Sequence, residues 1–224
     1  MENYYSYQST SNLSITKVFG YMFLGLLVSA LSAIGIYYLL ISGAINPGSY
    51  LTLTVISSIA LIVLIFVSQW YCIKNKRGGL LTYCLYALTM GVLLSSLMLA
   101  YSLRFLGFVF LCSAGSFGAM ALYGLLTKRS TTSLAMFGIG ALFGILTLSL
   151  VNIFLNSEPL YYLISYIGLA AMLAITAFDV NRIKQMANSG YMSEGIAIYM
   201  ALQLYTDFIY IFLRLVVILG RNRD

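Results

Sequence analysis

Two acidic residues, Asp179 and Asp207, stand inside long apolar stretches of the chain. Asp207 lies 12 residues into the apolar segment 195–219, close to its middle. An acid at the centre of a membrane helix costs at least about 2.5–3.5 kcal/mol, and such a residue usually faces a protein interior or a water-filled cavity. Asp207 is therefore the first candidate for a functional residue.

Asp179 lies near the end of the preceding apolar segment, 160–186, and could pair with Asp207. If the connection occupies residues 188–195, the two acids lie about 12 and 16 Å from it along adjacent antiparallel helices. Two carboxyl groups that meet in a low dielectric tend to share one proton, because both cannot ionise freely. Such a pair suits a proton-sensitive latch, or an oxygen site for a hard cation such as Ca²⁺. The alternative is that the two acids have unrelated structural roles.

Polar side chains recur every three or four residues along the last segment and form one face of a helix: Tyr199, Gln203, Asp207, Tyr210 and Arg214. A polar face belongs against other helices or water, so we expect the last helix to be central, with six packed around it. Gln203 and Arg214 are possible partners of the acid pair, although Arg214 can also extend to the outer interface. Arg182, three residues after Asp179, is a further possible partner.

The composition is that of a polytopic membrane protein. Hydrophobic residues make up 61 % of the 224 positions and charged residues 8 %, against about 45–50 % and 25 % in soluble domains. The chain has no histidine, which removes the commonest general base and transition-metal ligand. Its three cysteines are scattered without metal-type spacing. The net charge of +6 comes from dispersed basic residues, so we expect no nucleic-acid partner.

Seven apolar segments, each long enough to cross a bilayer, predict an all-α protein with seven transmembrane helices. They cover about residues 18–42, 50–73, 80–101, 106–127, 133–155, 160–186 and 195–219. We expect a loose polar tail over 1–14, a single membrane domain over 15–220 and a short basic end over 221–224. If the segments alternate, most basic residues fall on one side, which predicts a cytoplasmic N-terminus.

The stretches from Ala177 to Lys184 (AFDVNRIK) and from Ala201 to Ile209 (ALQLYTDFI) carry a family resemblance. Both resemble the last two helices of the Bax inhibitor (transmembrane Bax inhibitor motif) family, in whose last helix a tyrosine also precedes the acid by two positions. The seven-segment pattern extends the resemblance over about residues 15–219. It is nearest to the bacterial branch of the family, which implies an integral protein of the bacterial plasma (inner) membrane.

The resemblance implies six helices around a central seventh and a pH-sensitive calcium leak across the membrane. It implies that Asp179 and Asp207 are the proton sensor of the gate, with Ca²⁺ as the transported ion and no cofactor. Family members carry an arginine near the cytoplasmic end of the second helix that can bond to the pair. This sequence has Ile73 and Lys74 there, which makes Lys74 a possible partner.

Three other functions fit a membrane bundle with two acids. An intramembrane aspartyl protease also needs paired aspartates, but Leu204-Tyr205-Thr206 precedes Asp207 where those enzymes carry Gly-x-Gly; we therefore expect no enzyme. A proton-coupled cation exchanger would differ from the leak only in its coupling. A non-conducting regulator would act on a partner membrane protein. The expected partners are otherwise the lipid bilayer, Ca²⁺ and H⁺.

Overall fold

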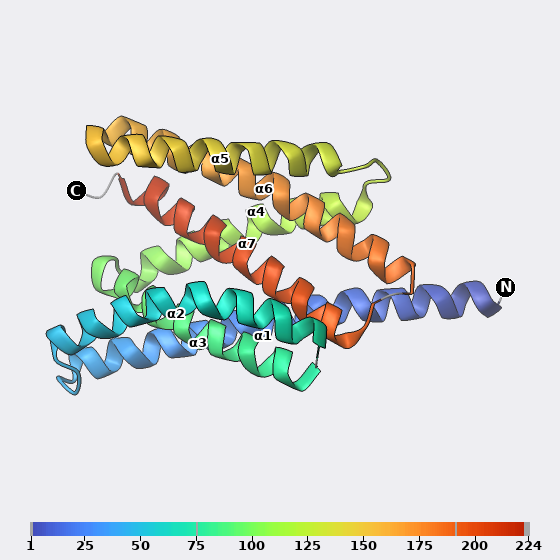
Figure 1. The fold of residues 1–224 in the computed structure, drawn as a ribbon, viewed down its shortest axis with the longest axis horizontal. Coiled ribbons are helices and arrows are strands. Elements are labelled where there is room, and N and C mark those ends of the chain that lie inside the picture. Colours follow the sequence, from blue (N-terminus) through green and yellow to red (C-terminus); the bar gives the residue numbers. More distant parts are fainter. Residues whose placement is uncertain (1, 75, 191, 222–224) are drawn as a thin grey trace. The chain divides into compact units, whose positions relative to one another are not determined.

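The computed structural model describes residues 2–74, 76–190 and 192–221, without the side chains of residues 2–14, 73 and 76. In these residues the chain forms seven α-helices and no strand (Figure 1). They are α1 (Glu2–Ile41), α2 (Pro47–Lys74), α3 (Lys76–Ala100), α4 (Leu103–Leu126), α5 (Thr132–Leu155), α6 (Glu158–Asn188) and α7 (Glu194–Gly220). Each contains a stretch long and apolar enough to cross a bilayer. The prediction of an all-α, integral multi-pass membrane protein is therefore confirmed.

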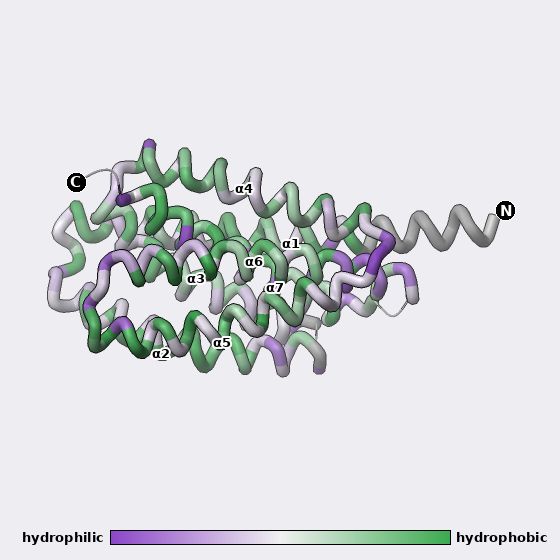
Figure 2. The backbone as a smooth tube through the Cα atoms, turned by 90° about the horizontal axis from the view of Figure 1, so that it is seen from above, coloured by the Kyte–Doolittle hydropathy of each residue, from purple (hydrophilic) through white to green (hydrophobic). Residues whose placement is uncertain are grey.

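Local sequence explains where the helices begin and end. Hydrophobic residues occupy most of the length of the helices, and hydrophilic ones gather mainly toward their ends (Figure 2). Pro47 opens α2, at the position where a missing N–H costs nothing. Residues with positive φ follow three helices: Gly43 (φ 74°), Asn156 (φ 45°) and Gly190 (φ 74°). A left-handed residue after a helix turns the chain without prolonging the helix.

The structure describes only part of what was predicted for the two ends of the chain. α1 begins at Glu2, well before its apolar stretch, Ile15–Ile41, so helical backbone extends through the residues expected as a tail. The division into tail, membrane domain and basic end stays a prediction. Residues 222–224 of the expected basic end lie outside the described residues.

The chain divides into two compact units, and α7 contributes to both. The first unit comprises residues 1–106 and 186–205. Within it α3 packs against α1 and α2. The Ser32 hydroxyl of α1 donates to the Leu88 carbonyl of α3, and Tyr50 of α2 bonds to Ser95 of α3. Gly195 of α7 lies against the Cys72 backbone of α2, with no room for a Cβ atom.

The second unit comprises residues 107–185 and 206–224. α6 lies against α4 at Gly124 and against α5 at Gly138, where an added Cβ would meet α6 atoms. The Phe208 ring of α7 makes edge contacts with two rings of α4, Phe110 and Phe117. The unit is thus joined by glycines of α4 and α5 that lie against α6 and by aromatic rings between α4 and α7.

Burial separates the last two helices from the others. In the most apolar window of α6 and of α7, 56 % of the residues are buried, against 17–28 % in the corresponding windows of α1 to α5. The first half of α7 contacts α1, α2 and α3 in the first unit. Its second half contacts α4 and α6 in the second unit. The expected burial of the last helix is confirmed, and α6 shares it.

Candidate functional site

Asp179 and Asp207 meet in the second unit. A hydrogen bond joins their carboxyl groups, one from α6 and one from α7. The side chains are 7 % and 5 % exposed. An ionised carboxylate can only accept hydrogen bonds, so this contact requires at least one of the two groups to be protonated. The structure thus places the two predicted acids together, at the middle of α7 and nine residues before the last residue of α6.

Protein groups use only part of the hydrogen-bonding capacity of the acid pair. The Asp207 Oδ2 atom is buried and has no hydrogen-bond partner among the described residues. Arg182, one turn after Asp179 on α6, interacts with Asp179 electrostatically, but its side chain is exposed. One oxygen of the pair is therefore available to a water molecule, a proton or a cation.

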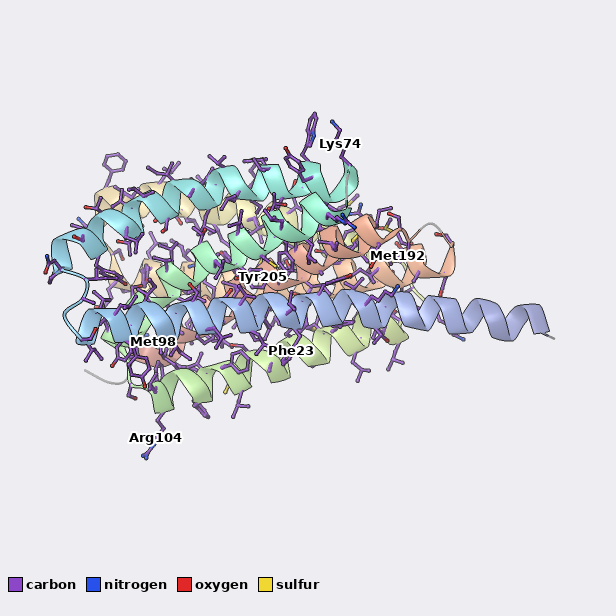
Figure 3. The ribbon with its side chains drawn as sticks, turned by 90° about the horizontal axis from the view of Figure 1, so that it is seen from below. Phe23, Lys74, Met98, Arg104, Met192 and Tyr205 are labelled. Atoms are coloured by element: carbon purple, nitrogen blue, oxygen red, sulfur yellow. The ribbon has the colours of Figure 1, made fainter. Side chains whose placement is uncertain are left out.

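The other predicted partners have different surroundings. Arg214 lies about 10 Å beyond Asp207 along α7; it donates to the Tyr210 hydroxyl (2.7 Å) and stacks on that ring. The Gln203 Oε1 atom is buried, again without a hydrogen-bond partner among the described residues. Lys74 is exposed and points away from the helices of its unit, whereas Tyr205 lies among them (Figure 3). A role for Gln203, Arg214 or Lys74 at the acid pair stays a prediction.

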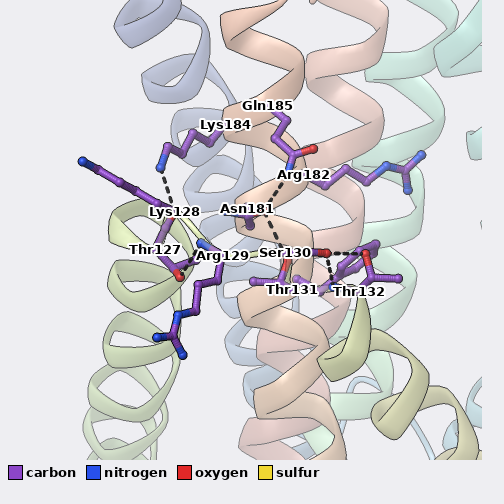
Figure 4. A pocket seen from close by; sticks show the side chains of 11 residues that line it. Thr127, Lys128, Arg129, Ser130, Thr131, Thr132, Asn181, Arg182, Lys184 and Gln185 are labelled. Carbon is purple, nitrogen blue, oxygen red and sulfur yellow. Dashed lines mark hydrogen bonds between the residues drawn. The ribbon is translucent and has the colours of Figure 1, made fainter.

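A buried amide holds the helix that carries Asp179. Asn181 is 3 % exposed and donates to the Gly124 carbonyl of α4 (3.0 Å). Its Oδ1 accepts from Thr131 at the start of α5 (3.2 Å) and from Gln185 (2.6 Å), as Figure 4 shows. Asn181 therefore anchors this end of α6 to both neighbouring helices, two residues after Asp179. Asn181 belongs to the AFDVNRIK stretch that carries the family resemblance, but the spacing of the residues in that stretch did not indicate its partners.

A second polar cluster lies in the first unit and escaped the sequence analysis. The Tyr205 hydroxyl and Ser29 Oγ are 2.5 Å apart, joining α7 to α1. Ser29 also bonds to the Ala87 carbonyl of α3 (2.9 Å), and Tyr83 meets the Tyr205 ring edge to face. The cluster fixes the first half of α7 to α1 and α3. Ser29 is one of several serines in an apolar helix, so no sequence signal marked it.

The acid pair alone offers few ligands for a metal. Among the described residues, no group of three or more His, Cys, Asp and Glu side chains could hold a metal ion. Ca²⁺ takes six to eight oxygen ligands, whereas two carboxyl groups supply at most four. Water or backbone oxygens would have to complete the coordination of a Ca²⁺ ion at Asp179 and Asp207, and its binding there stays a prediction.

Comparison with known proteins extends over nearly the whole chain. The family model described as inhibitor of apoptosis-promoting Bax1 matches residues 11–224. The inner membrane protein YbhL of Escherichia coli is 33 % identical over 221 residues, covering 93 % of this chain and 92 % of YbhL. The uncharacterized protein YrjE of Lactococcus lactis is 35 % identical over 224 residues, covering 95 % and 94 %. An uncharacterized protein of Rickettsia prowazekii is 32 % identical over 217 residues, covering 93 % and 89 %.

The match to the family model includes Asp179 and Asp207, the part of α1 from residue 11 on, and all of α2 to α7. They agree with the resemblance carried by the two aspartate motifs. The chain therefore belongs to the Bax inhibitor (transmembrane Bax inhibitor motif) family.

Proposed function

We propose that this protein is a pH-sensitive calcium leak channel whose gate is controlled by protonation of Asp179 and Asp207. The observation that carries the proposal is the hydrogen bond between two buried carboxyl groups on different helices. This bond exists only while the pair retains a proton. The bond therefore couples the protonation state of the pair to the contact between α6 and α7.

The electrostatic energy involved is large enough to move helices. Two unit charges about 4 Å apart at an effective dielectric constant of about 20 repel by roughly 4 kcal/mol. Loss of the shared proton would change the equilibrium between the joined and separated arrangements by almost a thousandfold, since about 1.4 kcal/mol is a factor of ten. A shift of this size can move a two-state element from mostly one arrangement to mostly the other.

The decisive experiment is calcium flux through purified protein in liposomes between pH 5 and 8. The Asp207→Asn variant keeps a hydrogen-bond donor for Asp179 but has no carboxyl proton to lose. We expect wild-type flux to change with pH and D207N flux to be constant with pH. Glu158→Gln is the matched control, because Glu158 is an exposed acid at the start of α6, and it should keep the wild-type profile.

The alternatives give distinct results in the same liposomes. If D207N retains the wild-type pH profile, the acid pair is not the sensor. Flux that requires an opposing proton gradient identifies a proton-coupled cation exchanger. The absence of ion flux at every pH, together with a stoichiometric membrane protein that copurifies, identifies a non-conducting regulator.

We further propose that the N-terminus is cytoplasmic and that the protein lies in the bacterial plasma membrane. The bias of basic residues supports this orientation, and the relative YbhL is named an inner membrane protein. Ser130 and Asn156 are exposed and lie at opposite ends of α5. In a cysteine-free background, an impermeant thiol reagent added to intact cells should label N156C and not S130C; the reverse pattern would contradict the orientation.

A further inference from the structure

A polar cavity of about 720 Å³ lies in the second unit, between the loop that joins α4 to α5 and the end of α6 (Figure 4). Four of the described residues that line it are cationic, and none is acidic: Lys128, Arg129, Arg182 and Lys184. Hydroxyl groups of the loop and of the first residue of α5 also line it, together with the Asn181 and Gln185 amides and Phe178. Such a set of donors is suited to an anion with several oxygens.

The start of α5 adds to the positive character of this cavity. Thr131 precedes α5; its hydroxyl donates to the Asn181 side chain and makes no cap bond to the helix. The N-terminal end of a helix carries a partial positive charge and presents free N–H groups. The cavity therefore combines side-chain cations with the positive end of a 24-residue helix.

Hydrogen bonds hold part of the polar lining of this cavity in place, so the cations are not all free in solvent. Lys184 is held by a bond from its Nζ to the Thr127 carbonyl (3.1 Å), and the buried Asn181 fixes the wall formed by α6. Lys128 and Arg129 are exposed, and neither packing nor a side-chain hydrogen bond to the described residues holds their long side chains away from a ligand in the cavity. The cavity therefore has a wall held by hydrogen bonds, with two exposed cations at its rim.

We propose that this cavity binds a phosphate group, contacted by Lys128, Arg129 and the hydroxyl groups at the start of α5. The phosphate would come from an anionic phospholipid headgroup or from a soluble phosphate. The cavity lies at the end of the bundle expected to face the cytoplasm, where anionic lipids attract basic side chains. This site is independent of the proposed ion flux, so either proposal can fail without the other.

The test uses the double variant Lys128→Gln/Arg129→Gln. Because Lys128 and Arg129 are exposed, we expect their replacement to leave the helix packing intact. The matched control is Lys17→Gln/Lys74→Gln, which removes two exposed cations of the first unit. In one arm, binding of radiolabelled inorganic phosphate is measured by equilibrium dialysis in phosphatidylcholine nanodiscs. In the other, native mass spectrometry counts phosphatidylglycerol retained from nanodiscs of equal phosphatidylcholine and phosphatidylglycerol content.

We expect the double variant to weaken binding roughly 25-fold, about fivefold for each cation removed, and the control to match wild type. Loss in the dialysis arm identifies a soluble phosphate as the source, and loss confined to the lipid arm identifies the headgroup. Absence of saturable binding in both arms overturns the proposal. Equal weakening in the double variant and the control also overturns it, because the effect would then be one of general surface charge.

Discussion

Replacement of Asn181 by alanine removes three hydrogen bonds: two join α6 to other segments and one lies within α6. The Gly124 carbonyl of α4, the Thr131 hydroxyl and the Gln185 amide each lose their bond to this side chain. Asn181 is 3 % exposed, so water cannot easily take its place. We expect N181A to loosen the contact of α6 with α4 and α5 near Asp179.

The cost can be estimated from these three bonds. Side-chain hydrogen bonds in membrane proteins contribute on average about 0.6 kcal/mol each, and up to about 1–2 kcal/mol. Their combined loss is therefore about 2–3 kcal/mol. For a chain of this length, 1 kcal/mol shifts the unfolding temperature by about 2–4 °C, so N181A should unfold roughly 4–12 °C below wild type.

Thermal unfolding in detergent at constant pH measures this effect. Gln185→Ala removes only one of the three bonds and is the graded control, with about one third of the loss. An N181A unfolding temperature equal to wild type, or higher than that of Q185A, would show that the hydrogen bonds of Asn181 do not stabilise this end of α6.

Two further predictions concern the first unit. Gly195→Ala would place a Cβ atom on the backbone carbonyl of Cys72; we expect about 1–3 kcal/mol of destabilisation in detergent unfolding, while G140A, at a site with open space, should change stability little. Tyr205→Phe keeps the aromatic ring but loses the bond to Ser29, at about 1 kcal/mol. In a double-mutant cycle with Ser29→Ala the two losses should not add, and full additivity would mean that this bond contributes nothing.

Several features of the protein follow from the sequence because they depend on local chemistry. In hydrocarbon each backbone group must find its partner within its own segment, so seven long apolar stretches separated by polar turns predict seven helices. Helix geometry alone then places residues on faces. The spacing of Gln203, Asp207 and Arg214 therefore predicted one polar face of the last helix, and the cost of a buried acid singled out Asp207.

The burial of α6, as deep as that of α7, could not be predicted in the same way. The polar face of the last segment marked only α7, and α6 is apolar around most of its circumference. Lipid and a neighbouring helix offer an apolar side chain nearly the same environment. Apolar composition therefore does not distinguish a helix that faces lipid from one packed between helices.

What the sequence by itself determined is the membrane class, the seven helices and the position of each acid along its helix, since each depends on composition and on 1.5 Å of rise per residue. Only the tertiary structure decided that the Asp179 and Asp207 carboxyl groups meet, that Asn181 bonds to α4 and α5, and that basic residues from two segments surround one cavity. These features depend on how each helix is rotated about its axis and packed against helices distant in sequence. That choice is made by side-chain packing across the whole unit, and no local pattern encodes it.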